Sequence, residues 1–75
     1  MAPRPRRLTA REVVRVLSQN GFELIAQKGS HQKWRHPGTR KQVTVPMHWG
    51  RDLPIGTLQA IKKGSGLSEE VWEGA

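Results

Sequence analysis

Residues 22–45, FELIAQKGSHQKWRHPGTRKQVTV, decide the fold. Apolar side chains recur at every second position of the first part: Phe22, Leu24 and Ala26. Such alternation is typical of a strand, and residues 31–36 and 42–45 form two further short runs of this kind. Gly29-Ser30 and residues 37–40 are turn sequences that separate the three runs. Because turns this short allow only antiparallel pairing, we predict a three-stranded antiparallel meander.

A first helix is predicted ahead of the meander. Thr9 and Glu12 have the Thr-x-x-Glu spacing of a capping box, in which each residue satisfies a free amide of the other. Four apolar residues follow the i, i+3, i+4, i+7 pattern of one buried helical face: Ala10, Val13, Val14 and Leu17. Asn20-Gly21 is a helix stop. We therefore expect a helix from Ala10 to Gln19.

Further helical segments are predicted after the meander. Residues 47–53 are expected to form a loop, and Pro54 suits the first turn of a helix, where an amide is not needed. The apolar stripe of this helix is formed by Ile55, Leu58 and Ile61. It should run to Lys63 and end at Gly64 and Gly66. Residues 68–70 could then start a last short helix that carries Val71 and Trp72.

The predicted order α-β-β-β-α defines an α+β domain, in which two amphipathic helices cover one face of the sheet. Side chains alternate between the two faces along each strand. The covered face should carry five apolar residues: Phe22, Leu24, Trp34, Val43 and Val45. The opposite face should carry five polar or basic ones: His31, Lys33, Arg35, Gln42 and Thr44.

Size and charge limit the classes of function. The 75 residues predict a single domain, 1–75, in which the basic, proline-interrupted residues 1–8 form a flexible tail. A net charge of +7 favours an anionic partner. The absence of cysteine excludes disulfides and thiolate metal sites and fits the reducing cytosol. No apolar run could cross a membrane, so we expect a cytoplasmic protein.

The basic residues are concentrated where acids are absent. No carboxylate side chain lies between Glu23 and Asp52, whereas this interval holds six cations: Lys28, Lys33, Arg35, Arg40, Lys41 and Arg51. It also holds all three histidines: His31, His36 and His48. Such a surface attracts phosphate, and histidine transfers protons near neutral pH. The interval therefore favours nucleic-acid binding, with cleavage as a further function.

Five motifs occur in a characteristic order from about Leu8 to Trp72. They are Gly21-Phe22, Gln27-Lys28-Gly29-Ser30-His31, residues 43–48 (VTVPMH), residues 50–58 (GRDLPIGTL) and residues 66–70 (GLSEE). In this order and spacing the chain resembles the HicA family of toxin endoribonucleases. The chain departs from the pattern at Gln32, where many relatives have a histidine or a small polar residue.

The resemblance implies both a fold and an activity. HicA proteins are similar in fold to double-stranded-RNA-binding domains, and they cleave messenger RNA without a metal or other cofactor. They use a histidine of a Gly-Ser-His turn, which corresponds to His31 in this chain. A cognate HicB-type antitoxin blocks them. The implied partners are therefore mRNA and an antitoxin, with no membrane and no small-molecule cofactor.

The chemistry of RNA cleavage fits these residue types. RNA carries its own nucleophile, the 2′-hydroxyl, so an enzyme must remove that proton, stabilise the phosphorane and help the 5′-oxygen leave. Histidine, with an ordinary pKa of about 6.5, supplies both protonation states near pH 7. Lys28, Lys33 and Arg35 could stabilise the developing charge. Further RNA contacts are expected from the turn and from the loop before the last helices: Gly29, Ser30, His48 and Arg51.

Several assignments stay open at the level of sequence. His48 could be a second acid or base, a phosphate contact or a residue that packs on Trp49, and Trp49 could stack on a base. His36 is expected to be structural, on the same side as Trp34. The histidine spacings fit no standard zinc pattern. Two other functions fit the composition: a module that binds double-stranded or structured RNA without cutting it, and a protein whose basic face docks an acidic partner.

Overall fold

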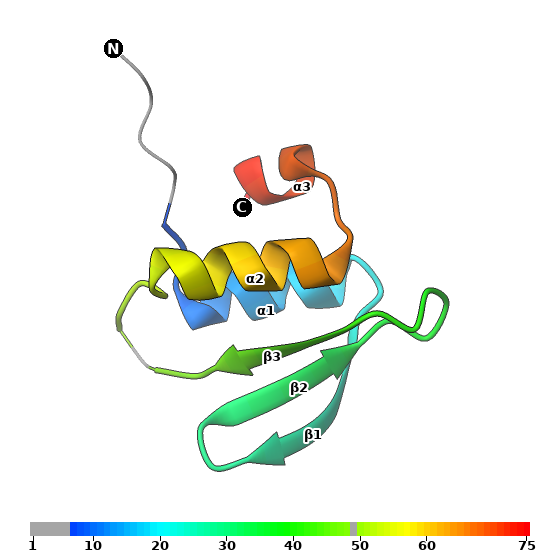
Figure 1. Ribbon diagram of the computed structural model, residues 1–75, viewed down its shortest axis with the longest axis horizontal. Helices are drawn as coiled ribbons and strands as arrows, with labels where there is room; N and C mark the ends of the chain where they lie inside the picture. Colours follow the sequence, from blue (N-terminus) through cyan, green and yellow to red (C-terminus); the bar gives the residue numbers. More distant parts are fainter. Residues whose placement is uncertain (1–6, 49) are drawn as a thin grey trace.

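The computed structural model describes residues 7–48 and 50–75 and has the predicted α-β-β-β-α order, followed by a short third helix (Figure 1). The six elements are α1 (Ala10–Gln19), β1 (Glu23–Lys28), β2 (His31–Arg35), β3 (Gln42–Pro46), α2 (Ile55–Ser65) and α3 (Glu69–Glu73). The α+β class and the antiparallel meander are thereby confirmed.

The three strands pair in the order β1-β2-β3, so β2 is central. In β3, Val43 is opposite Trp34 and Thr44 is opposite Lys33. Directly opposed residues project to the same face, which places Trp34 with the buried Val43 and Lys33 on the other side. The predicted division of β2 and β3 between two faces is confirmed.

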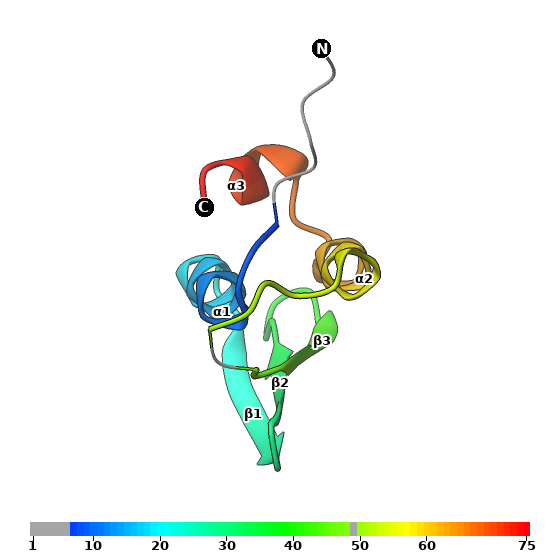
Figure 2. The same cartoon turned by 90° about the vertical axis from the view of Figure 1, so that its left-hand side faces the viewer.

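The layers are stacked on one side of the sheet only. Figure 2 shows α1 and α2 side by side on one face, and α3 on the far side of these helices from the sheet. We call the sheet face that points away from α1 and α2 the open face. The core lies between the helices and β3, and extends to α3 through the fully buried Trp72.

The first helix begins and ends where the sequence predicts. The Thr9 hydroxyl accepts a hydrogen bond from the Glu12 amide at 3.2 Å, and the Glu12 carboxylate accepts one from the Thr9 amide at 3.0 Å. The capping box is thus present. The buried stripe differs in detail, because Val16 is buried whereas Val14 is only half-buried.

The second helix runs two residues further than predicted. It ends at Ser65 and is capped by Gly66, whose φ of 69° is left-handed, whereas Gly64 lies inside the helix. Gly64 has a packing reason instead: a Cβ there would lie 3.1 Å from the Val43 side chain. The absence of a side chain at this position therefore lets α2 approach β3 closely.

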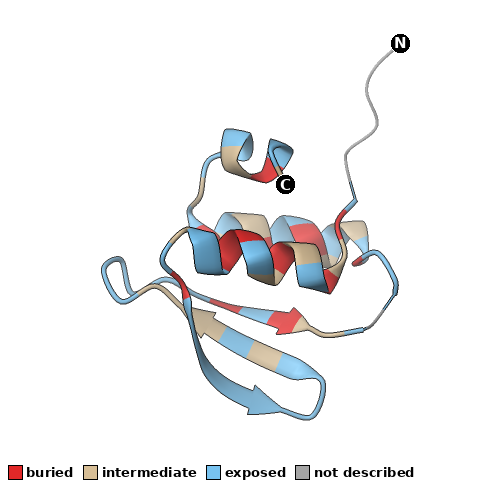
Figure 3. Ribbon diagram, turned by 180° about the vertical axis from the view of Figure 1, so that it is seen from behind, coloured by how far each residue is buried: buried red, intermediate tan, exposed pale blue. Residues whose placement is uncertain are grey.

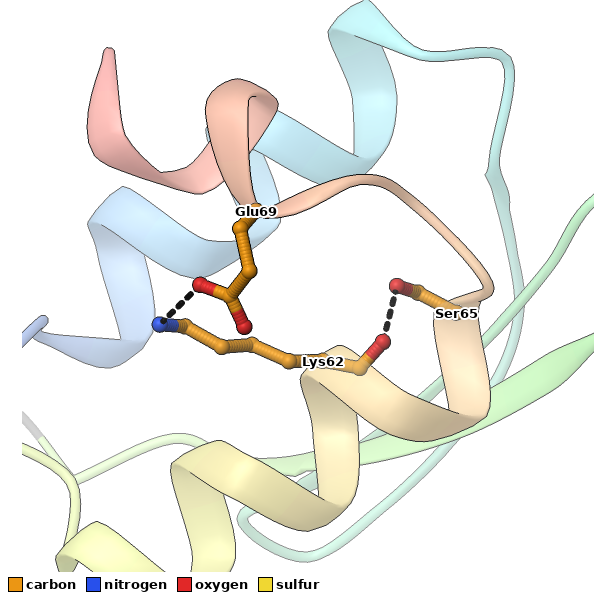
Figure 4. Close-up of polar contacts among 3 residues, drawn as sticks. All are labelled: Lys62, Ser65 and Glu69. Carbon is orange, nitrogen blue, oxygen red and sulfur yellow. Dashed lines mark hydrogen bonds and ion pairs between the residues drawn. The ribbon is translucent and has the colours of Figure 1, made fainter.

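The third helix is joined to α2 by a short polar connection (Figure 4). The Ser65 hydroxyl donates to the Lys62 carbonyl at 2.7 Å and accepts from the Leu67 amide at 3.1 Å, which satisfies this buried polar group. Lys62 Nζ lies 3.5 Å from Glu69 Oε2, an ion pair whose Glu69 side chain is 73% exposed. Such a pair adds little stability, so the buried Trp72 is the main anchor of α3.

Two residues differ from the predicted core. Leu24 is opposite Trp34 and so lies on the expected side of the sheet, but it is 46% exposed. Figure 3 shows why: β1 is exposed along its whole length, because the helices cover β3 and do not reach this edge strand. Leu8, expected in the flexible tail, is buried, and its carbonyl accepts a 2.8 Å hydrogen bond from the Leu53 amide. Residues 1–6 of that tail lie outside the described residues.

The regular alternation predicted for β1 is interrupted by a β-bulge. Leu24 is opposite Trp34, but the next pair is Ala26 with Lys33, so Ile25 has no opposite residue. Beyond the bulge, Ala26 and Lys28 share the open face with Lys33 and His31, their respective partners. The bulge therefore brings Lys28 to the same face as the histidine.

Candidate nucleic-acid interface

His31 lies at one end of the sheet, on the open face, and is exposed. It is the first residue of β2 and is opposite Lys28 on one side and Pro46 on the other. The two-residue turn that precedes it requires a left-handed residue at Gly29, whose φ is 58°. The hairpin thus presents His31 and Lys28 together beside a tight turn.

The Gly29-Ser30 turn is fixed to a second loop. The Met47 amide donates a 2.6 Å hydrogen bond to the Ser30 carbonyl. This bond extends the ladder beyond the β2–β3 pairing and brings the start of the loop between β3 and α2 against the turn. His48 is the next residue after Met47. The bond between Met47 and Ser30 therefore holds His48 close to the turn that precedes His31.

Lys33 and Arg35 continue the open face along β2. They are opposite Thr44 and Gln42 of β3, and strand alternation puts them on the same side as His31. Within the part of the chain that the structure describes, the side chains of His31, Lys33 and Arg35 have no hydrogen-bond or ion-pair partner. They are therefore available to an anionic ligand.

His48 and Arg51 lie in the loop between β3 and α2, and both are exposed. His48 borders two depressions: one of about 300 Å³ together with Arg11 and Met47, and one of about 530 Å³ together with Arg51 and Asp52. The loop is held by a 2.8 Å bond from the Leu53 amide to Leu8 and by a bridge between Thr9 and Asp52. Trp49, the candidate for base stacking, lies outside the described residues.

The loop places its residues at the same end of the sheet as His31, because Pro46 is opposite His31 and precedes Met47 directly. The predicted site residues therefore form two neighbouring groups. One is the turn with β2 (Lys28, Gly29, Ser30, His31, Lys33 and Arg35), and the other is the loop pair His48 and Arg51.

His36 differs from the other two histidines. Its Nδ1 accepts hydrogen bonds from the amides of Gly38 and Thr39 at 3.0 and 3.1 Å, so it shapes the turn between β2 and β3. Its ring packs edge-on against Phe22 with 5.4 Å between centroids. A Cβ on Gly21 would lie 2.8 Å from its Nε2. The expected structural role of His36 fits these contacts.

Arg40 is a residue of this surface that sequence reasoning did not select. It borders a depression of about 210 Å³ together with Arg35, beyond the end of β2 that is remote from His31. Its φ of 65° is unusual for a residue with a side chain. The signal in the sequence, one more arginine in a turn, was too common to single it out.

Residues 7–48 and 50–75 contain no group of three or more His, Asp or Glu side chains that could hold a metal ion. No helix within these ranges is long and apolar enough to cross a membrane.

Comparison with known families gives the class of the protein. The family model for the HicA toxin of bacterial toxin-antitoxin systems matches residues 10–67, from the first residue of α1 to just after the end of α2. No curated protein matches the chain in sequence. Because the match covers more than half of the chain, the protein belongs to the HicA family; it is a toxin, and an antitoxin is its implied partner.

Proposed function

We propose that the protein is an endoribonuclease that cleaves mRNA without a metal, with His31 as the general acid/base. The observation that carries the proposal is the position of His31: an exposed imidazole in the Gly-Ser-His turn of a HicA chain, on a face lined by unpaired cations. An exposed imidazole can reach a substrate that lies across an open surface, without a deep cleft.

The reaction is a transfer of the phosphodiester to the neighbouring 2′-oxygen. His31 removes the 2′-hydroxyl proton, the 2′-oxygen forms a bond to phosphorus, and the bond from phosphorus to the 5′-oxygen breaks. The products are a 2′,3′-cyclic phosphate and a free 5′-hydroxyl, so the 5′-oxygen must gain one proton. His31 can return the proton it removed, or His48 of the adjoining loop can supply another.

Cations next to His31 would stabilise the phosphorane. Lys28 is directly opposite His31, and Lys33 is two residues along the same face. These ammonium groups can stabilise the negative charge that develops on the phosphorane. The amide-rich turn at Gly29 and Ser30, together with Arg51 of the loop, would contact neighbouring phosphates.

The partner we propose is a HicB-type antitoxin that covers the open face. A protein that covers this face would exclude RNA and shield His31 at the same time. The exposed cations of β1 and β2 are available to such a partner on this face, and Ile25, which is 47% exposed and borders the same depression as Arg35, offers it an apolar contact.

The proposed activity is tested by incubating the purified protein with a long RNA, and with DNA of the same sequence, in excess EDTA. We expect the RNA to be cut into fragments with 2′,3′-cyclic phosphate ends and the DNA to stay intact, because DNA lacks the 2′-hydroxyl. Loss of cleavage in EDTA would contradict a metal-free mechanism. Binding of RNA without any cleavage would leave a non-catalytic RNA-binding module instead.

Substitution of Lys33 should affect RNA binding rather than the chemical step alone. Lys33→Ala removes one phosphate-binding charge from the open face, so affinity should fall and the slope of log Kd against log salt should flatten by about one unit. Lys63→Ala removes an equal charge from an exposed position on α2, which packs on the other face of the sheet. Equal effects of both substitutions on the salt dependence would mean that the open face does not bind RNA.

A further inference from the structure

The open face has a second feature at the end remote from His31. A depression of about 210 Å³ is bordered by Glu23, Ile25, Arg35, Pro37 and Arg40. Arg35 is the last residue of β2 and Arg40 belongs to the turn that follows. Glu23 and Arg35 are opposite one another in the sheet, so they share the open face.

The two guanidinium groups have no partner among the residues that the structure describes. Neither Arg35 nor Arg40 makes a side-chain hydrogen bond or ion pair with any residue in the described ranges, although Glu23 is nearby. Two guanidiniums and one carboxylate give this depression a charge of +1. Planar guanidinium groups are suited to phosphate oxygens, and Ile25, which is 47% exposed, offers an apolar surface beside them.

The backbone conformation of Arg40 supports a ligand-binding role for this depression. Arg40 is the one non-glycine residue with a positive φ in the described part of the chain, at 65°. The turn holds it there through a 2.8 Å bond from the Arg40 amide to the His36 carbonyl and a 2.9 Å bond from the His36 amide to the Lys41 carbonyl. Glycine would take this conformation without strain, so an arginine here favours a role for the side chain.

Apart from Lys28 of β1, which is opposite His31, the basic residues of the open face follow one strand. His31, Lys33 and Arg35 recur at every second residue of β2, and Arg40 follows at its end. The neighbouring row on β3 is uncharged, because its residues on this face are Gln42, Thr44 and Pro46. A single row of cations matches one phosphate backbone, whereas a duplex would present two backbones side by side.

We propose that the depression between Arg35 and Arg40 binds a phosphate of single-stranded RNA, on a strand that runs along β2 and is cut at the His31 end. The proposal rests on the proposed function and adds the form of the substrate and a remote subsite. Arg35 is four residues after His31 along the strand, a distance of about 13 Å. The RNA must therefore extend about two phosphates beyond the scissile bond, on one side, to reach the subsite.

The test uses DNA strands with a single ribonucleotide, so that cleavage has only one position. One series lengthens the flank on the 5′ side of the ribonucleotide and the other lengthens the 3′ flank, from one to five nucleotides. For the wild-type protein, kcat/KM should rise with length in only one series. In Arg40→Gly the rise should be lost, with a fall of about tenfold on the longest substrate and no change on the shortest.

Arg40→Gly is a favourable variant for this purpose because it also removes the backbone strain. It should unfold at the same urea concentration as the wild type or a higher one, so misfolding does not explain a loss of activity. Lys63→Ala is the matched control, with the same loss of one charge on α2, and should show the wild-type length dependence. A tenfold loss in this control, or an equal loss for Arg40→Gly on short and long substrates, would overturn the subsite.

Binding measurements test the phosphate subsite independently of the proposed ribonuclease activity. An all-DNA single strand cannot be cut, and its affinity by fluorescence anisotropy should fall about tenfold in Arg40→Gly. A hairpin duplex of equal length should bind more weakly than the single strand. If the wild type cleaves no substrate but this binding pattern holds, the ribonuclease assignment fails while the subsite remains; tighter binding of the duplex would overturn the single-strand proposal.

Discussion

His31→Ala should abolish cleavage of RNA while most of the affinity for RNA is retained. Proton transfer by a positioned side chain contributes about 10²–10⁴-fold, and the described residues place no second imidazole on the open strand face beside the turn. Affinity should persist because binding depends on cations such as Lys33, which the substitution leaves in place. The measurements are the initial rate of fragment release and the Kd on an uncleaved strand.

His48→Ala is the informative comparison for His31. His48 is also exposed and lies at the same end of the sheet, but in the loop rather than the strand. If the 5′-oxygen receives its proton from His48, the cleavage rate of this variant should fall by about 10²-fold or more. If His31 acts alone, the cleavage rate should fall only slightly. Wild-type rates in His31→Ala would remove His31 from the mechanism.

Trp72→Ala should have the largest effect on stability of any single substitution in α3. Trp72 is 1% exposed and is among the largest fully buried side chains, and truncation of a buried tryptophan costs about 3–5 kcal/mol. A domain of this size has a small reserve of stability, so the variant should be largely unfolded at 37 °C. Urea unfolding followed by circular dichroism measures the change.

Trp72→Phe separates packing from polarity at the same position. The Trp72 indole Nε1 is buried and has no hydrogen-bond partner among the described residues, which is unfavourable for an N–H group. Phenylalanine keeps most of the apolar volume and removes that group, so it should cost much less than alanine. If alanine and wild type unfold at the same urea concentration, α3 does not support the core.

The regular parts of the fold could be predicted because local signals agreed with tertiary packing. In α1 the capping residues Thr9 and Glu12 and a 3.6-residue apolar period specify the same helix, and its bounds were predicted correctly. In β2 and β3 the two-residue alternation alone predicted that Lys33 lies on one face of the sheet and that Trp34 and Val43 lie on the other. Each of these signals lies within a few residues of the element it specifies.

The errors come from interactions between distant parts of the chain. Leu24 belongs to an alternating apolar pattern that is typical of a covered strand. It is exposed because the helices do not extend over β1, which the local sequence does not reveal. Leu8 is buried because Leu53, far along the chain, pairs with it. The bulge at Ile25 depends on how β1 matches β2, and a one-residue irregularity of this kind changes which face later residues occupy.

The candidate site divides in the same way. The proximity of Lys28 and the turn to His31 could be predicted because these residues are adjacent in sequence, whereas the face that Lys28 occupies depends on the bulge. The position of His48 near the turn depends on the hydrogen bond from Met47 to Ser30. Arg40 is distinguished from the other arginines that the structure describes by its left-handed backbone. Neither a long-range bond nor a backbone angle leaves a pattern in the residue types.

The one-sided layering of the molecule has a consequence for how such toxins can diverge. All three helices and the whole buried core lie on the same side of the sheet, so the residues of the open face support almost none of the folding free energy. Surface substitutions of this kind usually change stability by no more than about 0.5 kcal/mol. Substitutions on this face can therefore accumulate one at a time, while the scaffold that carries it stays the same.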